Sequence, residues 1–249
     1  YVNLWKQPEE FTNLPAALRD QLAENFGFSS LSPVTVQESS DGETVKTLFK
    51  LRDGKSIETV LMKYDERRTL CISSQSGCAM GCVFCATGQM GFQRHLTSGE
   101  IVEQVLHYSR QLHAEHDQVT NIVIMGMGEP FHNYDSVLGA IDRLNDPKGA
   151  NIGARRFTIS TVGLVPGIRR FAAEKRQVNL AISLHSANNE LRSSLLPINK
   201  KYPLEELIKA CREYLEATNR RITFEWALIQ NVNDNLSQAA ELADLVKGM

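Results

Sequence analysis

The sequence predicts an α/β fold in which a parallel sheet with covering helices follows a small N-terminal helix and an antiparallel β appendage. From about residue 68, short apolar runs alternate with amphipathic helical patterns, as in repeated β-α units. Before that point, three strand-like runs are separated by turns that contain glycine. The 249 residues suffice for one large domain and a small appendage, so we place the two parts at residues 1–66 and 67–249.

The first part is expected to begin with an amphipathic helix and to continue as two hairpins. The helix is predicted over residues 8–26 because four apolar residues recur at four-residue spacing, namely Leu14, Leu18, Leu22 and Phe26. The strands are predicted over residues 34–38, 44–51 and 56–63.

The second part should contain five parallel strands, with a helix after each. The strands are predicted over residues 69–73, 121–126, 156–161, 178–185 and 222–229. The helices are predicted over residues 97–112, 135–145, 166–175, from Pro203 at position N1, and over 237–249. Thr97 and Glu100 form a capping box at the first of these helices. An open sheet of this kind would be a partial (β/α) barrel, and a doubly wound sheet is the alternative. In both, ligands bind beyond the carboxyl ends of the strands.

Composition and charge exclude several classes of protein. The net charge is −2 and no run of 18 apolar residues occurs, so we expect no membrane span, and global charge gives no support to nucleic-acid binding. Four of the five cysteines lie between positions 71 and 85, which favours a metal site in a reducing compartment, the cytoplasm, over a disulfide framework. The chain starts at Tyr1 and stops inside a predicted helix, so we expect a fragment.

The chemistry centres on Cys78, Cys82 and Cys85, which form a C-x3-C-x2-C loop after the first parallel strand. Three thiolates at this spacing can each bind one iron of a [4Fe–4S] cluster and leave one iron open for a further ligand. A zinc site completed by His95 or by a distant residue, and a simple cluster of buried thiols, remain alternatives.

Five motifs in order resemble one family, the radical S-adenosylmethionine (SAM) adenine C2-methyltransferases of the RlmN type. They are Cys71-Ile-Ser-Ser-Gln-Ser-Gly-Cys78 with the cysteine loop, Met125-Gly-Met-Gly-Glu-Pro130, Ile159-Ser-Thr161, Ile182-Ser-Leu-His185 and Leu196-Pro-Ile-Asn-Lys200. The resemblance implies a partial barrel of the radical SAM type and a [4Fe–4S] cluster whose open iron chelates SAM. It also implies 23S rRNA and tRNA as substrates and a reducing electron donor such as flavodoxin. We expect a monomer.

The resemblance also assigns cofactor contacts at the strand ends, where the matching residues are Gly128, Glu129, Ser160, Ser183, Leu184 and His185. Phe84 would lie against the adenine of SAM. From the residues alone, Glu129 could instead cap a tight β-α turn, and the polar strand ends could be helix caps or a hydrogen-bonded histidine.

Two catalytic residues follow from the resemblance alone. In the family mechanism, a C-terminal cysteine carries the methyl group, and a 5′-deoxyadenosyl radical takes hydrogen from it. The carbon radical then adds to adenine C2, and the position matching Cys71 resolves the crosslink by forming a disulfide. Glu58 matches the family's proton acceptor. Without the resemblance, Cys71 would be an inert strand thiol and Glu58 an exposed carboxylate.

The family's methyl-carrying cysteine would lie beyond Met249, and Cys211 is predicted to be core, so this fragment should not complete turnover. The alternative functions are the C8-methylating resistance enzyme of the same family and a catalytically dead RNA-binding or metal-binding module. Contacts with RNA phosphates are only weakly indicated, by the paired basic residues Arg67-Arg68, Arg155-Arg156, Arg169-Arg170, Lys200-Lys201 and Arg220-Arg221.

Overall fold

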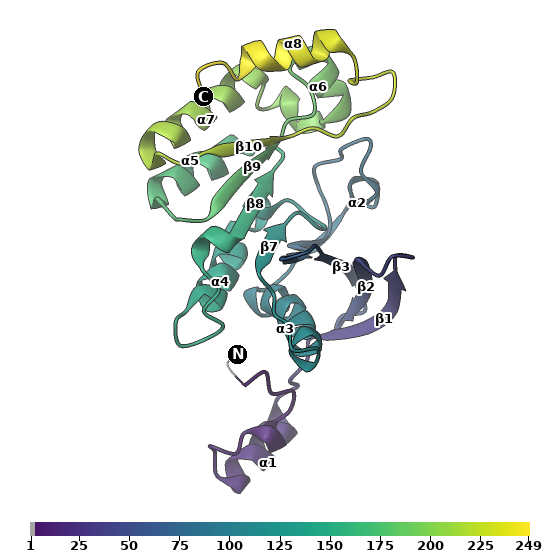
Figure 1. The fold of residues 1–249 in the computed structure, drawn as a ribbon, viewed down its shortest axis with the longest axis vertical. Coiled ribbons are helices and arrows are strands. Elements are labelled where there is room, and N and C mark those ends of the chain that lie inside the picture. Colours follow the sequence, from purple (N-terminus) through teal and green to yellow (C-terminus); the bar gives the residue numbers. More distant parts are fainter. Residues whose placement is uncertain (1–2) are drawn as a thin grey trace.

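The computed structural model describes residues 3–249, which form a twisted eight-stranded sheet in the order β1-β2-β3-β4-β7-β8-β9-β10 (Figure 1). Strands β1 to β4 are antiparallel, and β4, β7, β8, β9 and β10 are parallel. Their bounds are β1 Leu31–Glu38, β2 Thr44–Leu51, β3 Ser56–Lys63, β4 Arg68–Cys71, β7 Asn121–Ile124, β8 Phe157–Thr161, β9 Asn179–Ser183 and β10 Ile222–Glu225. The predicted α/β class is confirmed.

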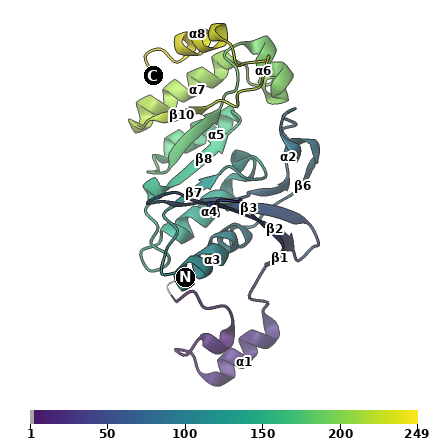
Figure 2. The same cartoon turned by 45° about the vertical axis from the view of Figure 1, so that its right-hand side comes forward.

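The hydrophobic core lies between one face of this sheet and the helices that follow the parallel strands (Figure 2). Those helices are α3 Ser98–Ala114, α4 Tyr134–Asn145, α5 Val165–Glu174 and α7 Leu204–Thr218, with α8 Leu236–Leu245 at the end of the chain. Ile57, Leu70 and Ile122 point into the core and are fully buried, whereas Glu58, Cys71 and Val123 belong to the opposite face and are half-buried. The opposite face is therefore less completely covered than the core face.

The predicted division at residues 66 and 67 falls in the turn between β3 and β4, inside a single sheet. Val60 pairs with Cys71 across these two strands, so the antiparallel strands extend the parallel sheet directly. Tyr1 and Val2 of the first predicted part lie outside the described residues. No helix in the described part of the chain is long and apolar enough to cross a bilayer.

The helix predicted over residues 8–26 is wrong in extent. The structure has a short 3-10 turn, η1 (Pro8–Glu10), and then helix α1 (Ala16–Asn25), because Pro15 cannot continue a helix that precedes it. None of the α1 residues is buried, and Phe26 is 62% exposed. The four-residue spacing therefore does not mark a buried face here.

Several short elements near the strand ends were not predicted. They are β5 (Gln75–Gly77) and β6 (Phe92–His95), which pair on either side of the cysteine loop, α2 (Ala86–Gln89) and α6 (Asn189–Leu195). Strand β10 ends at Glu225, four residues before its predicted end. Pro203 is the N-cap residue of α7 and not its first helical residue. Elements as short as β5, β6, α2 and α6 show little hydrophobic periodicity, so the sequence does not predict them.

The capping box at the start of α3 is confirmed. The Thr97 hydroxyl accepts from the Glu100 amide at 3.2 Å, and the Glu100 carboxylate accepts from the Thr97 amide at 2.9 Å.

We expect Thr97→Ala to lower the free energy of unfolding by about 1 kcal/mol, because the Glu100 amide loses its acceptor. Urea denaturation measures the change. Thr97→Ser keeps the hydroxyl and should recover most of the loss; equal losses in both variants would contradict the capping role.

Candidate active site

A cavity of about 250 Å³ lies beyond the carboxyl ends of β7, β8, β9 and β10. Eight of the predicted site residues line it together with Phe84: Cys78, Cys82, Cys85, Gly128, Glu129, Ser160, Ser183 and His185. They come from four separate stretches of the sequence, and the parallel sheet brings them to one edge. This is the location that both predicted architectures assign to a ligand.

The cysteine loop is held against helix α6 and the turn that follows it. The Val83 amide donates to the Leu195 carbonyl at 3.0 Å, and Met80 and Cys82 pack against a small apolar cluster that includes Leu195 and Leu196. Burial raises the pKa of the Cys82 thiol to about 12, and the neighbouring Cys78 and Cys85 add to the shift. The Cys82 thiol would therefore be neutral until a metal ion displaces its proton.

The donor set fits an iron–sulfur cluster better than a single zinc ion. All three thiols face one cavity, yet no three His, Cys, Asp or Glu side chains among residues 3–249 are grouped closely enough to hold one metal ion. His95 does not line the cavity; its Nδ1 is 3.0 Å from the side-chain nitrogen (Nε2) of Gln75, and its ring packs against His132. The zinc alternative with His95 therefore has no support from the geometry.

The turn after β7 contains two glycines that allow close approach to the Ile72–Gln75 segment. A Cβ on Gly126 would lie 2.8 Å from the Ser73 hydroxyl oxygen. One on Gly128, whose φ is +103°, would lie 2.5 Å from the Gln75 Cβ. The Gln75 side-chain oxygen accepts from the Glu129 amide at 2.8 Å. The turn is thus fixed on one side by a buried glutamine that sequence reasoning did not single out.

Glu129 does cap the turn, as the alternative interpretation stated. Its carboxylate accepts from the Phe131 amide at 3.0 Å, at the start of η2 (Pro130–Asn133), and from the Val162 amide at 2.9 Å. The same side chain lines the cavity. Each carboxylate oxygen can accept more than one hydrogen bond, so capping the turn leaves acceptor capacity for a ligand.

Burial raises the pKa of Glu129 to about 7, although its hydrogen bonds oppose the shift. The folded state therefore retains a proton that the unfolded chain loses above its ordinary pKa of 4.5. This contribution to stability is complete below pH 4.5 and is lost as the pH rises through about 7.

We expect the metal-free protein to lose on the order of 2 kcal/mol across this window. Urea denaturation at several pH values measures it; Glu129→Gln, which does not titrate, should flatten the profile, and an unchanged profile would contradict the assignment.

Glu225 is a cavity residue that sequence reasoning missed. Its carboxylate accepts from the Ser183 hydroxyl at 3.0 Å and from the Ser160 hydroxyl, and so it joins the ends of β8, β9 and β10. An acidic residue at the carboxyl end of the last parallel strand was the available signal. The predicted strand extended to residue 229, which placed Glu225 inside the strand instead of at its end.

His185 has a fixed tautomer. Its backbone is left-handed, with φ +56°, and its Nδ1 accepts from the Ala227 amide at 3.0 Å, which leaves the proton on Nε2. Burial lowers the pKa of His185 to about 4, with a further contribution from the charge of Arg192. The imidazole is therefore neutral at physiological pH. The ring of Phe84 packs edge-on against it with centroids 5.0 Å apart.

Three of the predicted site residues do not line the cavity. Leu184 is fully buried in the main core, and its amide donates to the Glu225 carbonyl. Cys71 is half-buried on β4. Glu58 lies on β3, is 43% exposed and forms an ion pair with Lys46 at 3.2 Å. Because Val60 pairs with Cys71 and Glu58 is two residues from Val60, Glu58 and Cys71 share the less covered face of the sheet.

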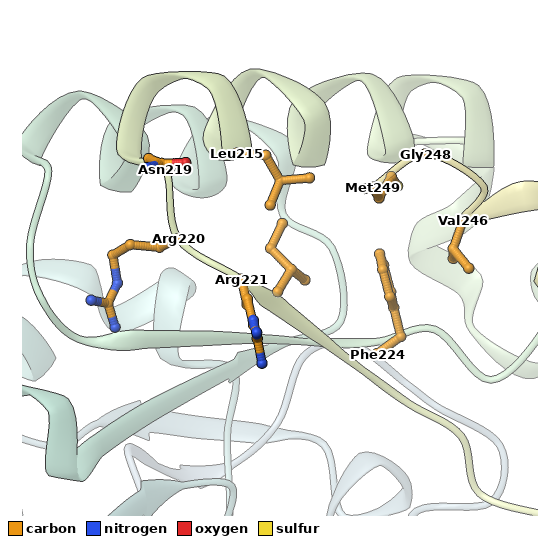
Figure 3. Close-up of a pocket in the computed structure, with 9 residues that line it drawn as sticks. Leu215, Asn219, Arg220, Arg221, Phe224, Val246, Gly248 and Met249 are labelled. Atoms are coloured by element: carbon orange, nitrogen blue, oxygen red, sulfur yellow. The ribbon is translucent and has the colours of Figure 1, made fainter.

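A larger hollow of about 590 Å³ lies elsewhere, between the end of α7, strand β10 and the last residues of the chain (Figure 3). Its walls hold apolar side chains such as Phe224 and Met249, and its charged side chains are those of Arg220 and Arg221. Arg220 is already bonded to Gln177 and Asn179. The wall residues include no thiol, carboxylate or imidazole side chain, so we assign the chemistry to the smaller cavity.

The family model for the radical SAM superfamily matches residues 72–243, which contain the cysteine loop and all the cavity residues. A probable dual-specificity RNA methyltransferase RlmN from Chloroflexus aurantiacus is 52% identical over 99% of this chain and 67% of its own length. One with the same name from Geobacillus kaustophilus is 50% identical over 100% of this chain and 68% of its own. This chain belongs to the RlmN family of radical SAM enzymes.

A solved structure supports the RlmN-family assignment at the level of the backbone. The crystal structure of a radical SAM methyltransferase from Sphaerobacter thermophilus is 51% identical and superposes with a TM-score of 0.97, over 100% of this chain and 73% of that one. The predicted partial barrel of the radical SAM type is therefore confirmed, and the doubly wound alternative is excluded. Enzymes of the radical SAM superfamily use SAM and a [4Fe–4S] cluster, and the donor set of this RlmN-family chain fits both.

Proposed function

We propose that the protein methylates C2 of a specific adenine in 23S rRNA and in tRNA, with SAM as the methyl donor and a methyl-cysteine as intermediate. The observation that carries the proposal is the cavity itself. Three thiols, a glycine–glutamate turn and two hydroxyl-bearing strand ends face the same 250 Å³ space, in a chain of the RlmN family. The curated relatives bear the name of dual-specificity RNA methyltransferases.

In this proposal, Cys78, Cys82 and Cys85 bind the cluster, and its open iron binds SAM. When bound, the pair supplies a carbon-centred radical, which the substrate requires because C2 of adenine has no lone pair that could attack a methyl group. A reducing donor such as flavodoxin would supply the one electron that this reaction needs. We place the protein in the cytoplasm, where 23S rRNA and tRNA are both present.

The protein's own residues would orient SAM from two sides. The turn at Gly128 and Glu129 presents backbone carbonyls and a carboxylate, which suit an ammonium group or ribose hydroxyls. From the other side, Ser160 and Ser183 are held by Glu225, while Phe84 packs on His185 and provides an apolar surface for the adenine ring. The side chain of Leu184 is buried in the core, so Leu184 would contact SAM only through its backbone, between Ser183 and His185.

Cys71 and Glu58 are proposed to act after the methyl group has reached the base. Burial raises the pKa of the Cys71 thiol to about 11, so it is held as a neutral thiol until it forms the resolving disulfide. Glu58 lies on the same sheet face, where it is half-buried and paired with Lys46, and in this proposal it accepts the C2 proton of a base bound there.

Anaerobic reconstitution with iron and sulfide tests the radical chemistry. We expect the reduced protein to cleave SAM to 5′-deoxyadenosine, which chromatography quantifies. Tight zinc binding without SAM cleavage would favour the metal-binding module instead.

To distinguish methylation at C2 of adenine from methylation at C8, the polypeptide extended to the length of its relatives is incubated with tRNA, and the methyladenosine is identified by mass spectrometry and NMR. In that form, Glu58→Gln should lower methylation by about 100-fold while SAM cleavage persists.

A further inference from the structure

Arg192, on helix α6, is a buried cation without an acidic partner. Its side chain is fully buried, and its guanidinium donates only to neutral oxygens. These are the carbonyl of Leu184 at 3.0 Å, the side chain of Asn199 at 2.8 Å and the carbonyls of Val162 at 2.7 Å and Ser183 at 3.3 Å. No carboxylate among residues 3–249 forms an ion pair with it. A buried charge without a counter-charge is costly, so its presence requires an explanation.

The hydrogen bonds of Arg192 link the chain at the ends of β8 and β9. This role explains why a hydrogen-bond donor is present here, but it does not explain why the donor is charged. Burial lowers the pKa of Arg192 to about 10, so the guanidinium still carries its positive charge at neutral pH. The charged forms of the Cys82 and Cys211 thiols would oppose the decrease, but burial raises the pKa of each to about 12, so both are neutral and neither is a counter-charge for Arg192. Cys211 is fully buried in the core, whereas Cys82 lines the cavity.

The surroundings of Arg192 connect it to the cysteine loop. Val162 and Ser183, whose carbonyls it binds, both line the cavity. Leu195, one helical turn further along α6, accepts from the Val83 amide in the cysteine loop at 3.0 Å. The charge is therefore held behind the wall of the cavity that carries Cys82, in a region from which water is excluded. There, an electrostatic interaction is stronger than it would be at the surface.

We propose that Arg192 is the buried counter-charge of the iron–sulfur cluster and raises its reduction potential. This inference rests on the proposed function, because it requires the cluster. A cluster bound by three thiolates is net negative, and it gains a further negative charge when it accepts one electron from the reduced donor. A fixed positive charge nearby stabilises the reduced form more than the oxidised form. Arg192 is thus a positioning and electrostatic residue that does not contact the reacting atoms.

The experiment compares the midpoint potential of the cluster in four reconstituted proteins by redox titration followed with electron paramagnetic resonance. The wild type is compared with Arg192→Lys, which keeps the charge, and with Arg192→Gln, which removes it. Asn199→Asp keeps Arg192 and places a carboxylate 2.8 Å from the guanidinium, so it neutralises the charge in a side chain of the same size, although it removes the hydrogen bonds that the Asn199 side-chain nitrogen donates to Asn189 and Ser193. We expect Arg192→Gln and Asn199→Asp to lower the potential by about 59 mV, a tenfold change in the one-electron equilibrium.

Arg192→Lys should retain most of the wild-type potential. The inference is overturned if all three variants keep the wild-type potential, or if Arg192→Lys and Arg192→Gln shift it equally, because then geometry and not charge matters. If the Arg192 variants fail to fold, as circular dichroism would show, the Asn199→Asp protein alone decides between a lowered and an unchanged potential. A protein that binds no reducible cluster at all, even in the wild type, would instead refute the proposed function.

Discussion

Cys82→Ser should abolish cluster binding and lower SAM cleavage by at least about 100-fold. The hydroxyl of serine is a poor ligand for iron, and the two remaining thiols, Cys78 and Cys85, cannot hold a cluster that needs three protein ligands. Iron and sulfide analysis, the visible absorption of the reconstituted protein and the yield of 5′-deoxyadenosine measure the effect.

The matched control for this variant is Cys211→Ala. Cys211 is fully buried on the core side of α7 and does not line the cavity, so its removal should cost about 1 kcal/mol of stability and leave the iron content unchanged. If Cys82→Ser bound as much iron as Cys211→Ala and cleaved SAM at the same rate, the cysteine loop would not be the cluster site.

Gly128→Ala should lower the free energy of unfolding by about 3 kcal/mol and weaken SAM binding in the same variant. Two effects add. The backbone at this position has φ +103°, which an alanine adopts only with strain, and the added Cβ would lie 2.5 Å from the Gln75 Cβ. Because Gln75 also binds the Glu129 amide, its displacement moves the carboxylate proposed to contact SAM. Urea denaturation and SAM titration measure the two losses separately.

Gly99→Ala is the matched control for the glycine variant. Gly99 is exposed in the first turn of α3, and a Cβ there would meet only the Thr97 hydroxyl at 3.8 Å. Alanine should therefore raise stability by about 0.5–1 kcal/mol and leave SAM binding as it is. A loss at Gly128 no larger than the change at Gly99 would show that the turn does not need glycine.

Some of the basic residues that could contact RNA phosphates form ion pairs with acidic residues of the protein. Arg68 forms an ion pair with Asp117 at 2.6 Å, and Arg170 forms one with Asp135 at 2.6 Å. These pairs are at or near the surface, where ion pairs contribute little to stability and exchange readily. Their presence neither requires nor prevents contact with RNA phosphates.

The sequence by itself determined the α/β class, nearly all of the main strands and helices, and the cysteine loop. Strong hydrophobic periodicity marks the core-facing strands, and metal ligands close together in the sequence form a local spacing pattern that needs no knowledge of the fold. The strand-end motifs could also be recognised, because the direction of parallel strands places their carboxyl ends at one edge.

Only the tertiary structure decided which polar residues support that edge. Gln75, Glu225 and Arg192 are separated in sequence from the groups they bind, and each looks like an ordinary surface residue in a linear pattern. Their roles depend on burial, which makes hydrogen bonds and charges matter far more than they would in water, and burial is a property of the assembled sheet and helices.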